Sequence, residues 1–404
     1  MAGKELVQQR TVWERSSNPI PPQKLPGNIT AEVLIVGAGT TGSLVAEALT
    51  ADGRRVVVFD RKPPASVSTS GSTALLLFEI DQPLTVLAKK IGHDKAARAW
   101  QRSNASMRRL TKKIKSLGID CDYIERSALL LPGNVLGPAG LRRECEARVA
   151  IGLPSRIIER AELLRDFGID RPCAILSGNS AEVDPVKMSR GVLNAATARG
   201  AKLFFPEEIK TLKADERRVI ATTKSGRKIT AQFVVLCCGF DIPKFLAVKH
   251  HSVVSTWAIA TKPQPENLWP SRALIWEAAE PYLYVRTTRE GRVLIGGEDE
   301  DHNDPARRQK RLPAKIKRLQ GKFARLMPKI NLEIDYAWSG AFGASDTGLP
   351  AIGNVPGMPR VCAVLGFGGN GTTYAQTAAE MISNALRGAR EPDIDLFAFP
   401  GGEG

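Results

Sequence analysis

The stretch EVLIVGAGTTGSLVAEALTADGRRVVVFD, residues 32–60, decides the fold of this chain. Its first five residues are a short apolar run rich in β-branched side chains, which predicts a parallel strand buried on both faces. A glycine-rich turn at 37–42 follows, and then apolar residues recur at helical spacing as far as Gly53. A second apolar run ends at Asp60. This order of strand, glycine turn, helix and strand predicts a nucleotide-binding α/β unit.

The three glycines of the turn have separate steric roles. Gly37 allows the tight turn, Gly39 lets the backbone approach a pyrophosphate, and Gly42 allows close packing of helix on strand. The helix N-terminus then faces the phosphates. At the end of the second strand, the Asp60 carboxylate is placed to accept hydrogen bonds from ribose hydroxyls. The turn predicts a dinucleotide site and does not by itself distinguish FAD from NAD.

Length and composition indicate an ordinary globular protein. Of its residues, 43% are hydrophobic and 25% are charged, as in ordinary globular proteins. Its length of 404 residues exceeds what one hydrophobic core usually supports, which predicts two domains. Six scattered cysteines and four histidines show no paired metal-ligand spacing, so we expect reduced thiols and no metal. No apolar run reaches membrane-spanning length. The first thirty residues carry charges and prolines without an apolar core, so we expect a cytoplasmic location.

The formal net charge of +15 raises the question of an anionic partner. The basic residues occupy the polar faces of two predicted helices, one around 100–117 and one at 304–327. Because no aromatic residues interleave with these charges, we interpret them as solvated helix faces and expect no nucleic-acid partner. The sequence does not indicate an oligomeric state.

A second glycine-rich turn, GFGGNG at 366–371, follows a predicted strand at 361–365 and precedes a predicted helix. Upstream lie Trp338-Ser339-Gly340 and the run DTGLPAIG at 346–353. Together with the first turn, these motifs resemble the FAD-dependent amine oxidoreductases of the D-amino-acid oxidase, glycine oxidase and sarcosine oxidase family. The resemblance extends from about Ala31 to Leu386.

The resemblance implies an α/β fold with two domains. A Rossmann-like FAD-binding domain of the glutathione-reductase type would comprise residues 27–88, 177–239 and 336–404. A second, α+β domain with an antiparallel sheet would comprise 89–176 and 240–335, and residues 1–26 would form an N-terminal extension. Strand candidates at 253–261, 273–277, 282–287 and 293–297 agree with that sheet, and the last two predict a hairpin.

The resemblance also implies one FAD. Covalent members of the family attach flavin to a cysteine near the segment matching 339–346, or to a histidine in the loop after the acidic strand end. This chain has neither, so we expect FAD to be held non-covalently. The implied cofactor-binding residues are Gly37, Gly39, Thr40, Thr41, Gly42, Asp60, Arg61, Ser70, Ser72, Thr73, Ala74, Ile209, Gly239, Gly368, Gly369, Asn370, Gly371 and Thr372.

For activity, the resemblance implies oxidation of a C–N bond in an amine or amino-acid-like substrate by hydride transfer to flavin. The product is an imine that water hydrolyses. On the strand at 282–287, alternation places Tyr282, Tyr284 and Arg286 on one face, which is our candidate substrate face. The alternative is that the tyrosines only pack and the arginine pairs with a carboxylate of the protein.

Two departures from the family narrow the substrate. Phe342 occupies the position where glycine oxidases hold the substrate carboxylate with an arginine, and a phenyl ring makes no ion pair. Thr373 stands where sarcosine oxidases carry a lysine. We therefore expect an amine without an α-carboxylate, or a carboxylate held elsewhere, with Arg286 as the candidate.

The sequence leaves two questions open, the electron acceptor of the enzyme and whether the chain is an enzyme or a binding module. Sarcosine oxidases use a lysine to activate oxygen, and the strand at 292–297 has none, whereas glycine oxidases work without it. An oxidase and a dehydrogenase therefore both agree with the sequence. The net charge also motivates a second hypothesis, a flavin-containing module that binds RNA or a protein partner.

Overall fold

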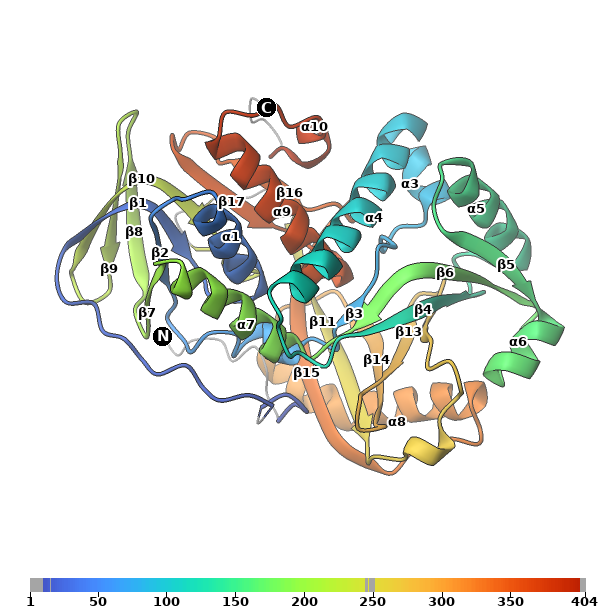
Figure 1. Cartoon of the computed structure of the whole chain (residues 1–404). Coiled ribbons are helices and arrows are strands. Elements are labelled where there is room, and N and C mark those ends of the chain that lie inside the picture. Colours follow the sequence, from blue (N-terminus) through green and yellow to red (C-terminus); the bar gives the residue numbers. More distant parts are fainter. Residues whose placement is uncertain (1–9, 15, 244–245, 247–250, 400–404) are drawn as a thin grey trace.

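The computed structural model describes residues 10–14, 16–243, 246 and 251–399, and it contains two β-sheets with helices packed against them (Figure 1). The sheets have eight and nine strands. Among the described residues, no helix has both the length and the apolar character needed to cross a membrane.

The eight-stranded sheet begins with the strand of the first glycine turn. Its main order is β16-β17-β10-β1-β2-β7, with β9 paired to β10 and β8 to β9. The pairs β7-β2, β2-β1, β1-β10 and β10-β17 are parallel, as the apolar runs predict. The strands are β1 (Ile29–Val36), β2 (Val56–Phe59), β7 (Lys202–Phe204), β8 (Ile209–Ala214), β9 (Val219–Thr223), β10 (Lys228–Leu236), β16 (Ala351–Asn354) and β17 (Val361–Leu365).

Both faces of this sheet are buried. On β1, Val33 and Ile35 pack in one hydrophobic cluster with α1 (Thr40–Ala51), α7 (Pro185–Ala198) and α9 (Gly371–Leu386). The intervening Leu34 packs in another cluster with β8, β9 and β10. Helix α7 begins with a side-chain cap, in which the Asp184 carboxylate accepts the N–H groups of residues 186 and 187.

The nine-stranded sheet runs β15-β11-β14-β13-β12-β4-β6-β3, with β5 paired to β6. The predicted hairpin is present as β13 and β14. All pairs are antiparallel, as expected, except β12 with β4, which are parallel. These two strands come from distant segments, so no tight turn forces them to be antiparallel. The strands are β3 (Leu75–Leu76), β4 (Ile124–Leu131), β5 (Ser155–Glu159), β6 (Cys173–Glu182), β11 (His251–Thr261), β12 (Leu274–Glu277), β13 (Leu283–Thr287), β14 (Val293–Glu300) and β15 (Ile334–Ser345).

The two faces of the nine-stranded sheet have different neighbours. The long helix α8 (Pro305–Leu326) covers one face, where Trp257 and Ile295 pack against Leu319 and Phe323. The other face meets the glycine-rich part of the molecule, because β15 lies against α2 (Ser68–Gly71) and against the short 3-10 turn η2 (Gly368–Asn370). The remaining helices are α3 (Leu84–Ile91), α4 (His93–Ser116), α5 (Pro138–Ala150), α6 (Arg160–Phe167) and α10 (Ile394–Phe397), with a 3-10 turn, η1 (Pro265–Asn267).

The sheets divide the chain close to the expected domain segments. Every strand of the eight-stranded sheet lies within 27–88, 177–239 or 336–404. The nine-stranded sheet takes β3, most of β15 and the end of β6 from those same segments. The domain division itself stays a prediction.

Candidate functional site

The first glycine turn has the steric form that the sequence predicts. Gly37 has φ +111°, and a Cβ there would lie 2.3 Å from the carbonyl oxygen of Cys237. At Gly42, a Cβ would lie 1.8 Å from the carbonyl oxygen of Gly37. No larger residue fits either position without moving the backbone. The turn therefore brings bare backbone to the start of α1, where a pyrophosphate is favoured by the helix N-terminus.

Asp60 braces this turn from the neighbouring strand. Its Oδ2 accepts the N–H of Ala38 at 2.7 Å, and its Oδ1 accepts the N–H of Lys62 at 2.8 Å. An ionised carboxylate has about four acceptor positions, so these bonds leave acceptor capacity for ribose hydroxyls. Burial raises the pKa of Asp60. The next predicted residue, Arg61, forms an ion pair with Asp241.

The segment 68–75, which contains four of the expected cofactor residues, includes the one-turn helix α2. The Thr69 hydroxyl accepts the N–H of Thr40 at 3.1 Å, which places α2 beside the first glycine turn. Two indoles hold the segment through backbone carbonyls. Trp13 Nε1 donates to the Ser72 carbonyl at 2.8 Å, and Trp338 Nε1 donates to the Gly71 carbonyl at 2.9 Å.

Arg286 holds the same segment. It is 2% exposed, and its Nη1 donates to the carbonyls of Thr73, Ala74 and Val183 at 3.0, 2.8 and 2.8 Å. The carboxylate of Glu182 lies 3.9 Å from its Nε. Sequence reasoning considered a substrate carboxylate or a protein carboxylate as its partner and missed these backbone carbonyls. Their positions are far from Arg286 in the chain, so no local signal indicated them.

The second glycine turn is contacted by a distant segment, residues 77–81. Asp81 Oδ2 accepts the N–H of Gly369 at 2.6 Å, and a Cβ on Gly368, where φ is +58°, would lie 2.3 Å from that oxygen. The Asn370 amide donates to the carbonyl of Glu79, and the Thr373 hydroxyl donates to the carbonyl of Leu77 at 2.7 Å. The turn and this segment therefore form one unit.

The other predicted cofactor residues lie around these two turns or at the sheet edge. Thr41 and Ser70 are buried, and the Ser72 hydroxyl accepts the N–H of Ala74. Gly239 has φ +63° and faces the hydroxyl of Ser68. Of the rest, Gly39 directly precedes helix α1 and Ile209 is the first residue of β8. Gly371 and Thr372 are the first two residues of helix α9.

The cofactor-side face of the nine-stranded sheet carries the predicted aromatic residues. Tyr284 pairs across the sheet with Gly296, and a Cβ on that glycine would lie 2.2 Å from the tyrosine ring, so the ring lies across β14. The rings of Tyr282 and Tyr284 are 5.7 Å apart. Phe342 pairs with Val254, which by alternation puts it on the same face as Thr256.

A bulge in β14 adds Asp299 to this face. Ser255 pairs with Glu300 and Trp257 with Gly297, so two residues of β14, Glu298 and Asp299, lie opposite one residue of β11, Thr256. Glu298 has φ +59°, an uncommon conformation for a residue with a side chain. Its carboxylate turns to α8, where Lys322 lies 2.6 Å away. The bulge leaves Asp299 directed to the opposite face, beside Thr256 and Tyr282.

The two carboxylates, Asp81 and Asp299, affect each other electrostatically. Burial raises the pKa of Asp299 to about 6, and the charge of Asp81 acts in the same direction. Burial also raises the pKa of Asp81 to about 6, although this side chain is in contact with solvent. Sequence reasoning missed both residues, although the acidic run 298–300 at the end of a predicted strand was a signal.

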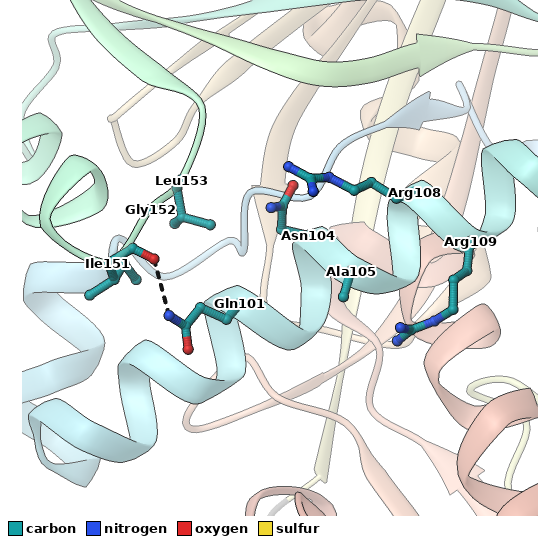
Figure 2. Close-up of a pocket in the computed structure, with 8 residues that line it drawn as sticks. All are labelled: Gln101, Asn104, Ala105, Arg108, Arg109, Ile151, Gly152 and Leu153. Carbon is teal, nitrogen blue, oxygen red and sulfur yellow. Dashed lines mark hydrogen bonds between the residues drawn. The ribbon is translucent and has the colours of Figure 1, made fainter.

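A surface hollow of about 530 Å³ lies elsewhere, between α4 and the turn at 151–153 (Figure 2). Gln101, Asn104 and Arg108 of α4 line it, and Gln101 donates to the carbonyl of Ile151 at 3.0 Å. None of the predicted cofactor or substrate residues lines this hollow.

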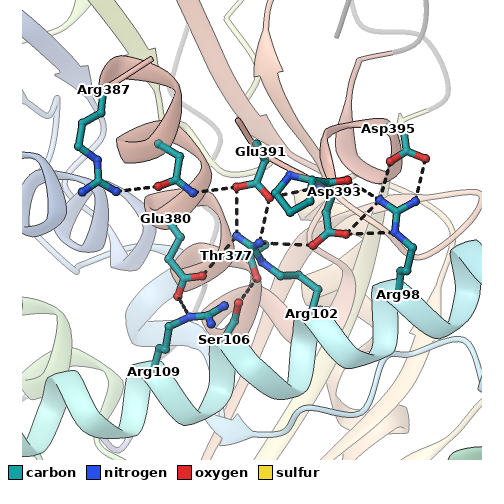
Figure 3. Close-up of polar contacts among 12 residues, drawn as sticks. Arg98, Arg102, Ser106, Arg109, Thr377, Glu380, Arg387, Glu391, Asp393 and Asp395 are labelled. Carbon is teal, nitrogen blue, oxygen red and sulfur yellow. Dashed lines mark hydrogen bonds and ion pairs between the residues drawn. The ribbon is translucent and has the colours of Figure 1, made fainter. Parts of the chain in front are cut away.

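The basic faces of the two long helices pair largely within the chain. Arg98, Arg102 and Arg109 of α4 form ion pairs with carboxylates of α9 and of the segment 391–395 (Figure 3). On α8, Arg311 and Lys315 pair with Glu300. These contacts give much of the positive charge a structural role. The sequence predicted solvated helix faces, whereas Arg102 and Lys315 are largely buried in ion pairs.

The comparisons with known proteins agree with the two-turn arrangement. A family model described as FAD-dependent oxidoreductase matches residues 32–385. Gamma-glutamylputrescine oxidoreductase from Escherichia coli is 25% identical, over 93% of this chain and 89% of that protein. Glycine oxidase from Geobacillus kaustophilus is 22% identical, over 91% of this chain and 96% of that protein.

Solved structures show the same fold. The crystal structure of the Geobacillus kaustophilus glycine oxidase has a TM-score of 0.76 at 20% identity, covering 93% of this chain and 100% of its own. L-proline dehydrogenase from P. horikoshii has a TM-score of 0.77 at 18% identity, covering 92% and 96%. The comparisons do not support the alternative of a flavin-containing binding module. Since the family model spans most of its length, the chain belongs to the FAD-dependent oxidoreductase family and is a flavoenzyme.

Proposed function

We propose that this enzyme oxidises the CH–NH bond of an amine to an imine, which water then hydrolyses. When bound, FAD would supply the hydride acceptor, and the protein would orient and desolvate the substrate. The residues we assign to FAD are those of the two glycine turns, the segment 70–74, Asp60, Arg61, Ile209 and Gly239. The N-terminal amides of α9 would favour negative charge on the reduced ring.

The observation that carries the substrate assignment is the charge of the cofactor-side face. Phe342 presents an apolar ring on this face, Asp299 adds a carboxylate to it, and the charge of Asp81 lies within electrostatic range of Asp299. A substrate carboxylate buried here without a partner would cost several kcal/mol. The substrate we propose is therefore a primary or secondary amine without a carboxylate at this position.

In this proposal, Arg286 does not replace the arginine that glycine oxidases have at the position of Phe342. Its guanidinium is buried and donates to three carbonyls around the segment 73–74. We assign it as a positioning residue that orders this segment. Tyr282 and Tyr284 remain the candidates for direct contact with the substrate.

The relatives support an amine substrate without fixing its identity. One is named for oxidising gamma-glutamylputrescine, another for oxidising glycine, and a structural neighbour is an L-amino acid deaminase. The acidic face favours the first kind of substrate. The cytoplasmic location and the division into domains at the predicted boundaries also stay proposals.

The test is anaerobic mixing of the purified yellow protein with a panel of amines, N-methyl amino acids and D-amino acids while flavin absorbance is followed. Butylamine and 1,4-diaminobutane should bleach the flavin faster than glycine or D-alanine. Faster bleaching by glycine or D-alanine would contradict the substrate assignment. Failure of every amine and amino acid to bleach the flavin would contradict the reaction.

A further inference from the structure

We infer that Asp81 and Asp299 determine specificity for a cationic nitrogen of the substrate, so that the substrate class is an amine that binds with a positive charge. The nitrogen whose C–N bond is oxidised loses a proton to solvent before hydride leaves its carbon, because an ammonium nitrogen has no lone pair with which to form the imine. This inference rests on the proposed function, because it names the substrate class for the same site. The two carboxylates come from different parts of the fold. Asp81 belongs to the segment bonded to the second glycine turn, and Asp299 belongs to the sheet face opposite it.

The bulge in β14 is the first step of the argument. Regular alternation from Gly296 would place Glu298 on the cofactor side and Asp299 against α8. The extra residue reverses both directions. Lys315 Nζ donates to the carbonyl oxygen of Glu298 at 2.5 Å, and the Glu298 carboxylate pairs with Lys322. Contacts with α8 therefore hold a strained backbone whose effect is to direct Asp299 at the site.

The cations of α8 pair with both neighbours of Asp299 and not with Asp299 itself. Glu300, like Glu298, pairs with Lys315, at 3.0 Å. Among the described residues, Asp299 has no ion pair, and its Oδ1 is buried without a hydrogen-bond partner. A buried acceptor without a partner costs free energy, which a ligand cation would recover. The middle residue of the acidic run is thus the one available to a ligand.

The aromatic surroundings suit a cation. Tyr282 and Tyr284 present two rings 5.7 Å apart beside Asp299, and ring faces attract ammonium groups. Tyr374 of α9, which lies within electrostatic range of Asp81, is 1% exposed, and its hydroxyl has no hydrogen-bond partner among the described residues. Two carboxylates and two tyrosine rings therefore lie within electrostatic range of one another.

The test separates charge from shape with two ligands that need no turnover. The FAD-loaded protein is titrated with choline and with its neutral isostere 3,3-dimethylbutan-1-ol, and binding is followed through the flavin spectrum. Choline should bind at least about tenfold more tightly, which corresponds to about 1.4 kcal/mol. Asp299→Asn and Asp81→Asn should each remove most of that preference. Asp94→Asn, at an exposed carboxylate on α4, is the matched control and should leave it unchanged.

Equal affinity for the two ligands, or binding of neither, would overturn the inference, and this comparison on the unaltered enzyme does not depend on any variant folding. If the Asp299→Asn variant retains FAD and still prefers choline over the neutral isostere as strongly as the unaltered enzyme, the inference is wrong for Asp299. If amines bleach the flavin but choline binds no better than its isostere, the subsite fails and the proposed function stands. If choline binds through Asp299 but no amine bleaches the flavin, the reaction fails and the subsite stands.

Discussion

The two glycine-rich turns, 37–42 and 366–371, share a local plan but differ in what surrounds them. Each follows a parallel strand, opens with a glycine of positive φ and leads into a helix. Asp60, from the next strand, braces the first turn, so its whole unit lies within about thirty residues of sequence. The second turn is completed by Asp81 and faces Asp299, both far away in the chain. The comparison indicates that the first turn is a local unit, whereas the second turn is completed by tertiary contacts.

The largest effect should come from replacing Gly37. Gly37→Ala combines an unfavourable positive φ with a clash against the Cys237 carbonyl, and each effect costs about 1–3 kcal/mol. We expect loss of bound FAD and a lowered Tm. Gly200→Ala is the matched control, since φ is +100° and no described atom lies within 4 Å of the added Cβ. Equal Tm values and full FAD content in both variants would refute the steric role of the first turn.

A smaller effect is expected at Arg286, which joins the segment 73–74 to the nine-stranded sheet. Arg286→Met leaves buried carbonyls without a donor, at a cost of about 1–3 kcal/mol. FAD affinity and Tm should fall while KM for an amine changes little. Arg289→Met, on the same hairpin but exposed, is the control. An unchanged FAD affinity with a strongly raised KM for the amine would indicate that Arg286 contacts the substrate instead.

Asp60→Ala should act on the cofactor alone. We expect FAD binding to weaken by about 1–3 kcal/mol, the scale of a hydrogen bond to a charged group. Asp215→Ala is the control, because that carboxylate also accepts two backbone N–H groups but lies in an exposed turn. Equilibrium dialysis of FAD measures the difference. Identical FAD affinity in the two variants would mean that Asp60 does not contact the ribose.

The fold was largely predictable because its signals are local. The parallel strands, the two glycine turns and the Asp184 cap each depend on residues close together in sequence. The substrate face was predictable only in part. Alternation indicated Tyr282 and Tyr284, but a bulge changes the alternation by one residue and so hid Asp299. The contacts of Arg286 join positions 213 and 103 residues apart, which no pattern within one strand indicates.

The carboxylates near the second turn should respond to pH. Burial raises the pKa of both Asp81 and Asp299 to about 6, so they lose charge as the pH falls through that value. Choline affinity should therefore decrease between about pH 7 and pH 5. The groups that act on Asp299 are Thr256, Tyr282, Asp81 and Lys315. A flat affinity profile over this range would argue against the acidic pair as the cation site.

We expect no covalent bond between FAD and the protein. Because the family's attachment residues are absent, acid precipitation should release all the yellow colour into the supernatant. Colour retained in the pellet would show a covalent bond and would require another attachment site.

The most direct measurement of the central claim is the rate of anaerobic flavin reduction by an amine carrying deuterium on the amine-bearing carbon. The control is the same amine with deuterium on the far carbon. The account predicts that only the first substitution slows reduction, because hydride leaves that carbon. Equal rates for the two labelled amines, with chemistry shown to limit reduction, would contradict oxidation of the C–N bond.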